Sequence, residues 1–203
     1  GVLIVDATCP RVLVNQKRAA DYTAQGYMLV IAGDKNHGEL IGIKGYALSV
    51  PNGRCATVQT AVEAKALQYD GAPTILIAQT TITREEYRAI AEILRKKIPD
   101  LTVLETICPA TDERQEALLE LIDEVDALLV IGGKTSANTR RLVQTALDRG
   151  TPAWLAETAD DIPEALYGYE TIGLAAGAST PDSSIDAVEA ALRSYSDRKK
   201  ETV

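Results

Sequence analysis

Two stretches of the sequence decide the fold: "YMLVIAGDKNHGEL" at 27–40 and "ALLVIGGKTSANTRRL" at 127–142. Each begins as a short, almost continuous apolar run and then becomes a polar loop that contains glycine. Apolar runs of this length are typical of strands that are buried on both faces of a parallel sheet. One pattern that occurs twice, about one domain length apart, predicts two related α/β units.

The same two kinds of segment alternate along the rest of the chain. The short apolar runs predict strands at 2–6, 28–33, 74–79, 101–105, 127–133, 152–157 and 171–177. Apolar residues at helical spacing predict helices at 84–97, 114–125 and 138–149. The alternation predicts an α/β protein in which right-handed crossovers place helices over parallel sheets, so that each unit has three layers.

A Cys-Pro pair marks the repeat more sharply. Cys9 and Cys108 each precede a proline, and Gly33 follows Cys9 at nearly the distance at which Gly133 follows Cys108. A further apolar run and a Thr/Ser-rich loop then complete each half. We therefore expect two homologous units, 1–105 and 106–203.

Sites in parallel α/β sheets lie beyond the carboxyl ends of strands. The loops that follow the predicted strands carry the chemically versatile residues of this chain, so we expect the two units to pack around a central cleft. The two cysteines would lie at its base, with hydroxyl and amide side chains around them.

Composition excludes several classes of function. The 203 residues include 21 Lys and Arg against 29 Asp and Glu, a net charge of −8, which argues against nucleic-acid binding through phosphate neutralisation. No apolar run approaches the length of a membrane span. Three widely spaced cysteines do not form a secreted disulfide framework, so we expect a cytoplasmic protein without membrane contact.

The cysteines differ in what they suggest. A lone cysteine after a strand is usually a small buried apolar residue. Cys9 and Cys108 occupy equivalent places in the repeat, which favours a role as metal ligands, although two thiolates alone complete neither a zinc nor an iron–sulfur site. Cys55 has no counterpart in the repeat, and we interpret it as structural.

The polar loops favour a small anionic ligand. His37, the only histidine, lies beside Glu39 on a glycine-rich loop, and such a pair suits anion contact and proton delivery as well as a plain surface position. The loops at 79–81, 134–139 and 177–180 are rich in Ser, Thr and Asn. Such residues cap helices, and the same groups bind phosphate at helix N-termini.

At these residues the sequence resembles a known family, the 4-hydroxy-3-methylbut-2-enyl diphosphate reductases of the non-mevalonate isoprenoid pathway. The matching stretches, in family order, are "VDATCP", "HGE", "QTT", "TICPAT" followed by "RQ", "SAN" and "AGASTP". The resemblance implies three similar α/β domains around a 4Fe–4S cluster, of which this chain carries the second and third. It also implies reductive removal of an allylic hydroxyl, with electrons from a donor such as ferredoxin or flavodoxin.

The resemblance assigns roles residue by residue. Cys9 and Cys108 would be cluster ligands, Glu39 the proton source, and Thr80 its relay partner. The residues implied to contact the allylic diphosphate substrate are His37, Thr81, Ser136, Asn138 and Ser179.

Some positions depart from the family pattern. Ala137 stands where the family has a serine, which removes one diphosphate donor. Asp34 replaces a histidine, and Gly38 replaces a proline. The family's first domain, with the third cluster cysteine, is not part of the sequence, so the chain alone is expected to lack activity if that domain is required.

Two other functions stay open. A non-catalytic α/β module that grips a small phosphorylated ligand needs only the Ser/Thr loops and no metal. A zinc hydrolase using Cys9, Cys108 and His37 would require zinc and would tolerate air, but the chain has no compact Cys/His ligand motif.

Overall fold

The structure is a computed structural model that describes residues 2–3 and 5–201. The chain divides into two compact units, Gly1–Pro109 and Ala110–Val203. Each unit is built on a parallel sheet, four-stranded in the first and three-stranded in the second. The predicted α/β class with parallel sheets is confirmed.

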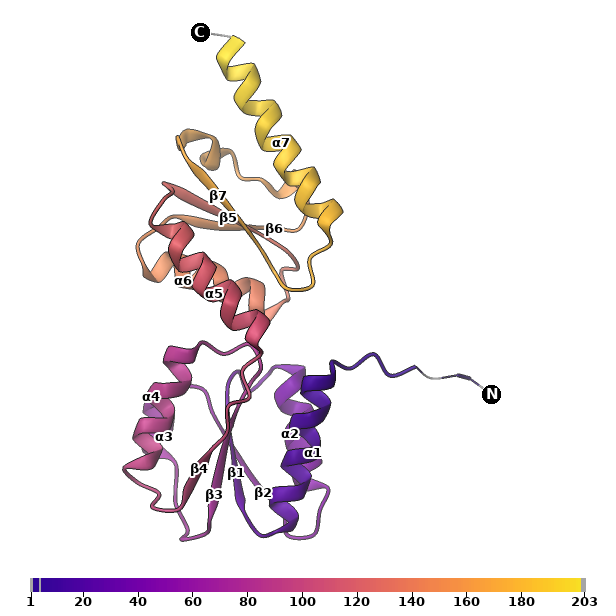
Figure 1. The fold of residues 1–203 in the computed structure, drawn as a ribbon, viewed down its shortest axis with the longest axis vertical. Coiled ribbons are helices and arrows are strands. Elements are labelled where there is room, and N and C mark those ends of the chain that lie inside the picture. Colours follow the sequence, from indigo (N-terminus) through magenta and orange to yellow (C-terminus); the bar gives the residue numbers. More distant parts are fainter. Residues whose placement is uncertain (1, 4, 202–203) are drawn as a thin grey trace. The chain divides into compact units, whose positions relative to one another are not determined.

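The first unit alternates helices and strands along its whole length (Figure 1). Its strands lie in the order β2-β1-β3-β4, and all neighbours are parallel. The elements are α1 (Pro10–Ala24), β1 (Met28–Ala32), α2 (Gly38–Leu48), β2 (Arg54–Val58), α3 (Ala61–Ala66), β3 (Thr74–Ala78), α4 (Arg84–Arg95) and β4 (Leu101–Val103).

Helices cover both faces of this sheet (Figure 1). Alternate residues of a strand point to opposite faces. On β1, Val30 therefore packs with α3 and α4, whereas Leu29 packs with α1 and α2. Both side chains are fully buried, and burial of a large apolar side chain contributes roughly 1.5–3 kcal/mol. The two separate apolar clusters explain why β1 and β3 are apolar without interruption.

The second unit has the strand order β6-β5-β7, again parallel. One apolar cluster lies between its sheet and α5 and α6, and another lies between the sheet, η2 and α7. The elements are α5 (Pro109–Ile122), β5 (Ala127–Ile131), α6 (Ala137–Asp148), β6 (Ala153–Ala156), η1 (Ala159–Asp161), η2 (Glu164–Gly168), β7 (Ile172–Ala176) and α7 (Asp182–Glu201).

The fold differs from the sequence expectations in two places. No strand forms at 2–3 and 5–6, where Val2, Leu3 and Val5 are at least 79% exposed, and Ile4 lies outside the described residues. A strand needs a hydrogen-bonded neighbour, and none of the described strands pairs with this segment. The sequence reasoning also missed β2, because this edge strand is only half-buried and begins with Arg54.

The predicted helices are present with shifted ends. The helix expected from 114 starts at Pro109, since proline at the first helical position fits the backbone without losing a hydrogen bond. Within the part of the chain that the structure describes, no helix combines the length and the apolar composition needed to cross a bilayer.

Candidate active site

In both units the same pattern of backbone hydrogen bonds, here called the backbone frame, holds the polar loops at the strand ends. In the first unit the N–H of Gly33 donates to the carbonyl of Val58, and the N–H of Gln79 donates to that of Ala32. In the second unit Gly132 and Gly177 donate to the equivalent carbonyls, those of Ala156 and Ile131. The frame thus brings the ends of three neighbouring strands together in each unit.

The hydrogen bonds also correct the register of the repeat. The position in the second unit that is equivalent to Gly33 is Gly132, not Gly133 as expected from the sequence. Gly33 and Gly132 have φ values of 151° and 148°, a backbone conformation that favours glycine. With this pairing, the spacing from the Cys-Pro cysteine to the glycine is the same in both halves.

His37 and Glu39 lie at the N-terminus of α2. His37 is the N-cap residue, and its Nδ1 accepts a hydrogen bond from the backbone N–H of Glu39 at 3.2 Å. Because Nδ1 is an acceptor, the ring proton of the neutral side chain is on Nε2. The half-buried imidazole therefore has its Nε2–H left to donate to a ligand.

The Glu39 carboxyl is buried and held by Thr80. The backbone N–H of Thr80 donates to Oε1 at 2.9 Å, and its hydroxyl lies 2.8 Å from Oε2. Burial raises the pKa of Glu39 above its ordinary value, although the two bonds from Thr80 and the nearby His37 act in the opposite direction. A carboxyl group in this state holds its proton to a higher pH than one in water.

Cys108 joins the same network through its backbone. Its N–H donates to the carbonyl of Thr80 at 2.9 Å. The chain before it runs beside the end of β3, where the buried hydroxyl of Thr106 bonds both the N–H and the carbonyl of Ala78. Hydrogen bonds thus link Glu39 and Thr80, the predicted acid and its relay, to the backbone of Cys108, a predicted ligand.

The other two cysteines lie in different settings. Cys9 is exposed and is the N-cap residue of α1, directly before Pro10. Cys55 lies on β2 against the apolar cluster below α1 and α2. Burial raises the pKa of the Cys55 thiol to about 12, so this group resists forming the thiolate that metals bind.

Gln79 was not assigned a role from the sequence, yet it connects two of the predicted loops. Its side chain is fully buried. Oε1 accepts from the backbone N–H of Asp34, and Nε2 donates to the hydroxyl of Thr81. Thr81 is therefore fixed from within its own loop. The partner Asp34 is 45 positions away in sequence, which is why no local pattern indicated the contact.

In the second unit the matching helix is α6. Ser136 is its N-cap residue and accepts from the backbone N–H of Thr139. Asn138 takes the place that Glu39 has on α2, in the first turn. Its side chain is only 6% exposed, and among the described residues neither Oδ1 nor Nδ2 has a hydrogen-bond partner. Buried polar atoms are rarely left unpaired, and an exception of this kind calls for an explanation such as a bound ligand, ion or water.

Ser179 and Thr180 follow β7, the strand next to β5. The Thr180 hydroxyl donates to the carbonyl of Ile131, while Ser179 is exposed. The hydroxyl of Thr139 lies so close to Gly177 that a Cβ there would approach it to 2.4 Å. Ser136, Asn138 and Ser179 therefore come from two loops on adjacent parallel strands of one unit.

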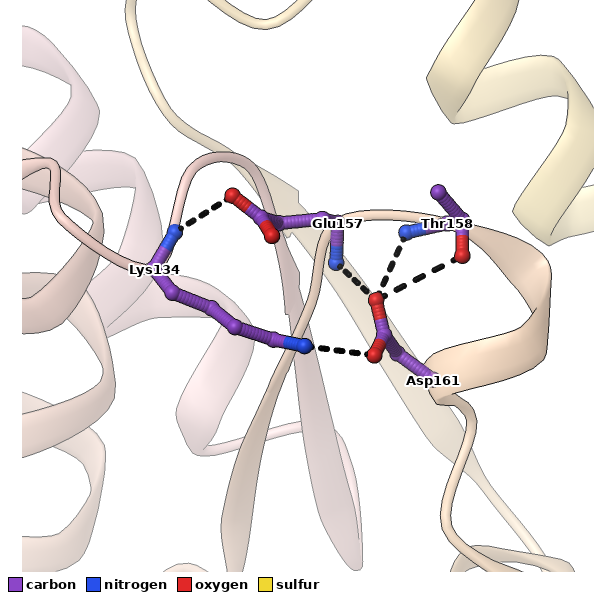
Figure 2. Close-up of polar contacts among 4 residues, drawn as sticks. All are labelled: Lys134, Glu157, Thr158 and Asp161. Carbon is purple, nitrogen blue, oxygen red and sulfur yellow. Dashed lines mark hydrogen bonds and ion pairs between the residues drawn. The ribbon is translucent and has the colours of Figure 1, made fainter.

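Figure 2 shows a group of polar contacts beside this loop that the sequence did not reveal. Glu157 accepts from the backbone N–H of Lys134, and the Lys134 ammonium pairs with Asp161 at 2.6 Å. Asp161 also accepts from the backbone N–H groups of Glu157 and Thr158, and these contacts, led by that with Lys134, lower the pKa of Asp161 to about 2. Lys134 is thus bound to carboxylates of its own unit.

The donor set allows a partial test of the expected iron–sulfur cluster. Cys9 and Cys108 are both free thiols, and each directly precedes the first residue of a helix. Both thus carry a sulfur atom that is free to serve as a ligand. Among the described residues, no group of three or more His, Cys, Asp or Glu side chains is arranged to hold a metal ion. Two thiolates do not complete a cluster site.

Together these features define a class of protein. It is a parallel α/β protein with a buried acid and hydroxyl and amide groups at helix N-termini, all at the carboxyl ends of strands. Groups of these kinds are the ones that proteins use to bind small anions and to transfer protons.

Comparison with known proteins identifies the family. The model of the LytB protein family matches residues 1–193, and the chain belongs to this family. A curated 4-hydroxy-3-methylbut-2-enyl diphosphate reductase from Treponema denticola is 54% identical over 198 residues, and one from Treponema pallidum is 48% identical over 210 residues. The resemblance noted in the sequence is thereby confirmed.

Solved structures agree. A structure of E-1-hydroxy-2-methyl-but-2-enyl-4-diphosphate reductase from Plasmodium falciparum matches 89% of the chain with a TM-score of 0.81 at 28% identity. A structure titled (E)-4-hydroxy-3-methyl-but-2-enyl diphosphate reductase, the terminal enzyme of the non-mevalonate pathway, matches with a TM-score of 0.54 at 34% identity. The chain spans 66% and 56% of the length of the two Treponema relatives.

Proposed function

We propose that this chain forms the acid and diphosphate-binding part of an iron–sulfur reductase that converts 4-hydroxy-3-methylbut-2-enyl diphosphate to isopentenyl and dimethylallyl diphosphate. One observation carries the proposal. Glu39, Thr80 and Cys108 lie on one continuous series of hydrogen bonds, which links a buried acid to the backbone N–H of a cysteine at a helix start.

The reaction needs a proton donor and a source of electrons. Two electrons and two protons are consumed, the bond between the allylic carbon and the hydroxyl oxygen breaks, the oxygen leaves as water, and a carbon–hydrogen bond forms. Glu39 gives the proton at the hydroxyl oxygen, and burial, which raises the pKa of its carboxyl above the ordinary value, favours the protonated form that this role requires. The Thr80 hydroxyl holds the carboxyl in place and lies beside the same oxygen.

Diphosphate is held by hydrogen-bond donors of the loops. Nε2–H of His37, the hydroxyls of Thr81, Ser136 and Ser179, and the amide of Asn138 are the groups proposed to bind it. The buried amide of Asn138 gains the partners that it lacks within the described chain. Donors at the N-termini of α2 and α6 also add the favourable helix dipoles.

Cys9 and Cys108 would hold a 4Fe–4S cluster together with ligands beyond this chain, and such a cluster would supply electrons received from a donor such as ferredoxin or flavodoxin. Cys55 takes no part, because its thiol is held protonated by burial.

The test uses the full-length protein, purified without oxygen and supplied with a chemical reductant. We expect iron and sulfide in the protein and conversion of the substrate to both products. Cys9→Ser and Cys108→Ser should each lose most of the iron, whereas Cys55→Ser keeps it. Equal iron loss in all three variants would mean that the ligands are wrongly assigned.

The unpartnered amide of Asn138 also fits a module that binds a small phosphorylated ligand without chemistry. Tight binding of the diphosphate by a full-length protein without iron and without turnover would favour that function.

A further inference from the structure

Gln79 uses every polar atom of its side chain between two loops. Its Oε1 lies 2.9 Å from the backbone nitrogen of Asp34, and its Nε2 lies 2.9 Å from the hydroxyl of Thr81. The side chain is fully buried, and both hydrogen bonds lead to groups that are only partly exposed. A hydrogen bond of this kind typically contributes about 0.5–1.5 kcal/mol to stability.

The backbone around Gln79 is shaped to receive this side chain. Its N–H is bound to the carbonyl of Ala32 at 2.7 Å. A Cβ at Gly33 would lie 2.6 Å from both the Cβ and the Oε1 of Gln79. The side chain therefore lies directly against the glycine that opens the histidine loop, and only a residue without a side chain fits there.

The second unit shows that the fold itself does not need this glutamine. Gly177 occupies the equivalent place and makes the same backbone hydrogen bond. The space that Gln79 fills in the first unit is approached in the second by the hydroxyls of Thr139 and Thr180. The same backbone frame thus forms with glutamine or with glycine at this position. The side chain of Gln79 is therefore not required for the α/β unit to fold.

We propose that Gln79 is a positioning residue, which, by joining the Asp34 amide to the Thr81 hydroxyl, fixes the loop that carries His37 against the loop that carries Thr80 and Thr81. This inference rests on the proposed function, because it takes both loops as parts of one diphosphate site. Gln79 itself is fully buried, with both polar atoms of its side chain bonded to the two loops, and is not proposed to touch the ligand.

Removal of both bonds should loosen the two loops without removing any proposed ligand group. Gln79→Met keeps the length of the side chain. We expect its KM for the diphosphate substrate, and its Kd for inorganic diphosphate, to rise about 10-fold, since each lost bond is worth a few-fold in an equilibrium constant. The kcat should fall by a smaller factor, because Thr80 still holds Glu39.

Gln79→Glu gives a readout that a merely structural role would not produce. A protonated glutamic acid copies the amide, since its carbonyl accepts from Asp34 and its hydroxyl donates to Thr81. The ionised form has no donor. We define the affinity ratio as the affinity of the variant for inorganic diphosphate divided by that of the wild type at the same pH. For Gln79→Glu this ratio should be near one at about pH 5 and fall towards about pH 8.

The titratable groups on the surrounding elements are Asp34, Lys35, His37, Glu39, Glu105 and Cys108. All of them are present in the wild type and in Gln79→Met as well, so the ratio to the wild type removes their contribution. A Gln79→Met ratio that changes with pH in the same way as that of Gln79→Glu would overturn the proposal.

The measurements use the full-length protein, with Gln68→Met as the matched control, because Gln68 is exposed and its one bond stays within its own turn. Amide hydrogen exchange at Asp34 should speed up in Gln79→Met and not in the control. If exchange at Asp34 and diphosphate affinity are both unchanged, Gln79 positions nothing.

The two proposals fail in different ways. A wild type that neither binds inorganic diphosphate nor turns over substrate contradicts the proposed function. A wild type that does both, with a Gln79→Met variant of equal affinity, contradicts only the role of Gln79. If Gln79→Met does not fold, the pH dependence of Gln79→Glu decides, and a flat ratio overturns the inference.

Discussion

The loops at the strand ends have the same backbone arrangement in the two units but carry different side chains. At the second residue of the helix the first unit has Glu39 and the second has Asn138, after the N-cap residues His37 and Ser136. Glu39 finds partners in Thr80, whereas Asn138 finds none in the described chain. The same frame thus carries a buried acid with partners in one unit and a buried amide without described partners in the other.

The comparison predicts opposite effects of Asn138→Leu on stability and on binding. An unpaired buried amide costs roughly 1–3 kcal/mol, so leucine of similar size should raise the free energy of unfolding. Hydrogen bonds to charged groups contribute about 1.5–3 kcal/mol, so diphosphate affinity should fall about 10- to 100-fold. Urea unfolding and calorimetric titration of the full-length protein measure both.

The control for Asn138→Leu is Gln144→Leu, an exposed position of the same helix. It should change neither quantity by a comparable amount. Unchanged diphosphate affinity in Asn138→Leu would show that the amide does not face the ligand.

The two glycines that open the loops should respond alike. Gly33→Ala and Gly132→Ala place a side chain at φ values of 151° and 148°, within 2.7 Å of the nearest atom in each case. Strained backbone of this kind costs about 1–3 kcal/mol, so both variants should unfold at lower urea concentration. Gly38→Ala is the control, since a Cβ there meets no atom within 4 Å. A neutral result at either glycine would break the equivalence of the two frames.

The acid of the first unit should make stability depend on pH. Because the pKa of Glu39 is raised in the folded state, the folded protein binds more protons than the unfolded one as pH passes above the ordinary value of 4.5. Stability contributed by the neutral carboxyl is therefore lost as pH rises through the folded pKa. Glu39→Gln should match the wild type in acid and exceed it at neutral pH. A constant difference in urea unfolding across this range would contradict the raised pKa.

The smallest effects are expected at the lysines of the two loops. Lys35 pairs with Glu63 at 2.7 Å, and Lys134 pairs with Asp161. Each of the two acids also accepts a hydrogen bond from a backbone N–H group that precedes the helix of that acid. These pairs are exposed, and exposed ion pairs are weak and screened by salt. Glu63→Gln and Asp161→Asn should lower the melting temperature slightly, less so at high salt. A large loss in only one of them would separate the two loops.

The sequence predicted those parts of the fold that depend on local patterns. β1, β3 and β5 are buried on both faces, and their unbroken apolar runs indicated them directly. The run at 2–6 looked the same but forms no strand where it is described, because pairing depends on a neighbour and not on composition. The repeat was recognised one residue out of register at Gly133, and only the hydrogen bonds of Gly132 place it.

The site was predictable to a similar extent. The loops that carry Glu39 and Thr80 were identified because loops after adjacent parallel strands meet at one edge, and the roles of the two residues were implied by the family resemblance. The bond from Cys108 to Thr80 and the links made by Gln79 join positions distant in sequence, so no motif could indicate them. The assigned roles of these residues, and the contribution of Cys9, stay predictions.

The most direct test of the account is the turnover of Glu39→Gln in the full-length protein, measured without oxygen against Glu92→Gln, an exposed glutamate of the same unit. Glutamine keeps the size of the side chain and its bond from the Thr80 N–H but has no proton to give. We predict unchanged iron content and substrate binding with turnover about 10²–10⁴-fold lower, the usual range for loss of a general acid. Turnover of Glu39→Gln close to that of Glu92→Gln would contradict the proton-donor role at the centre of the account.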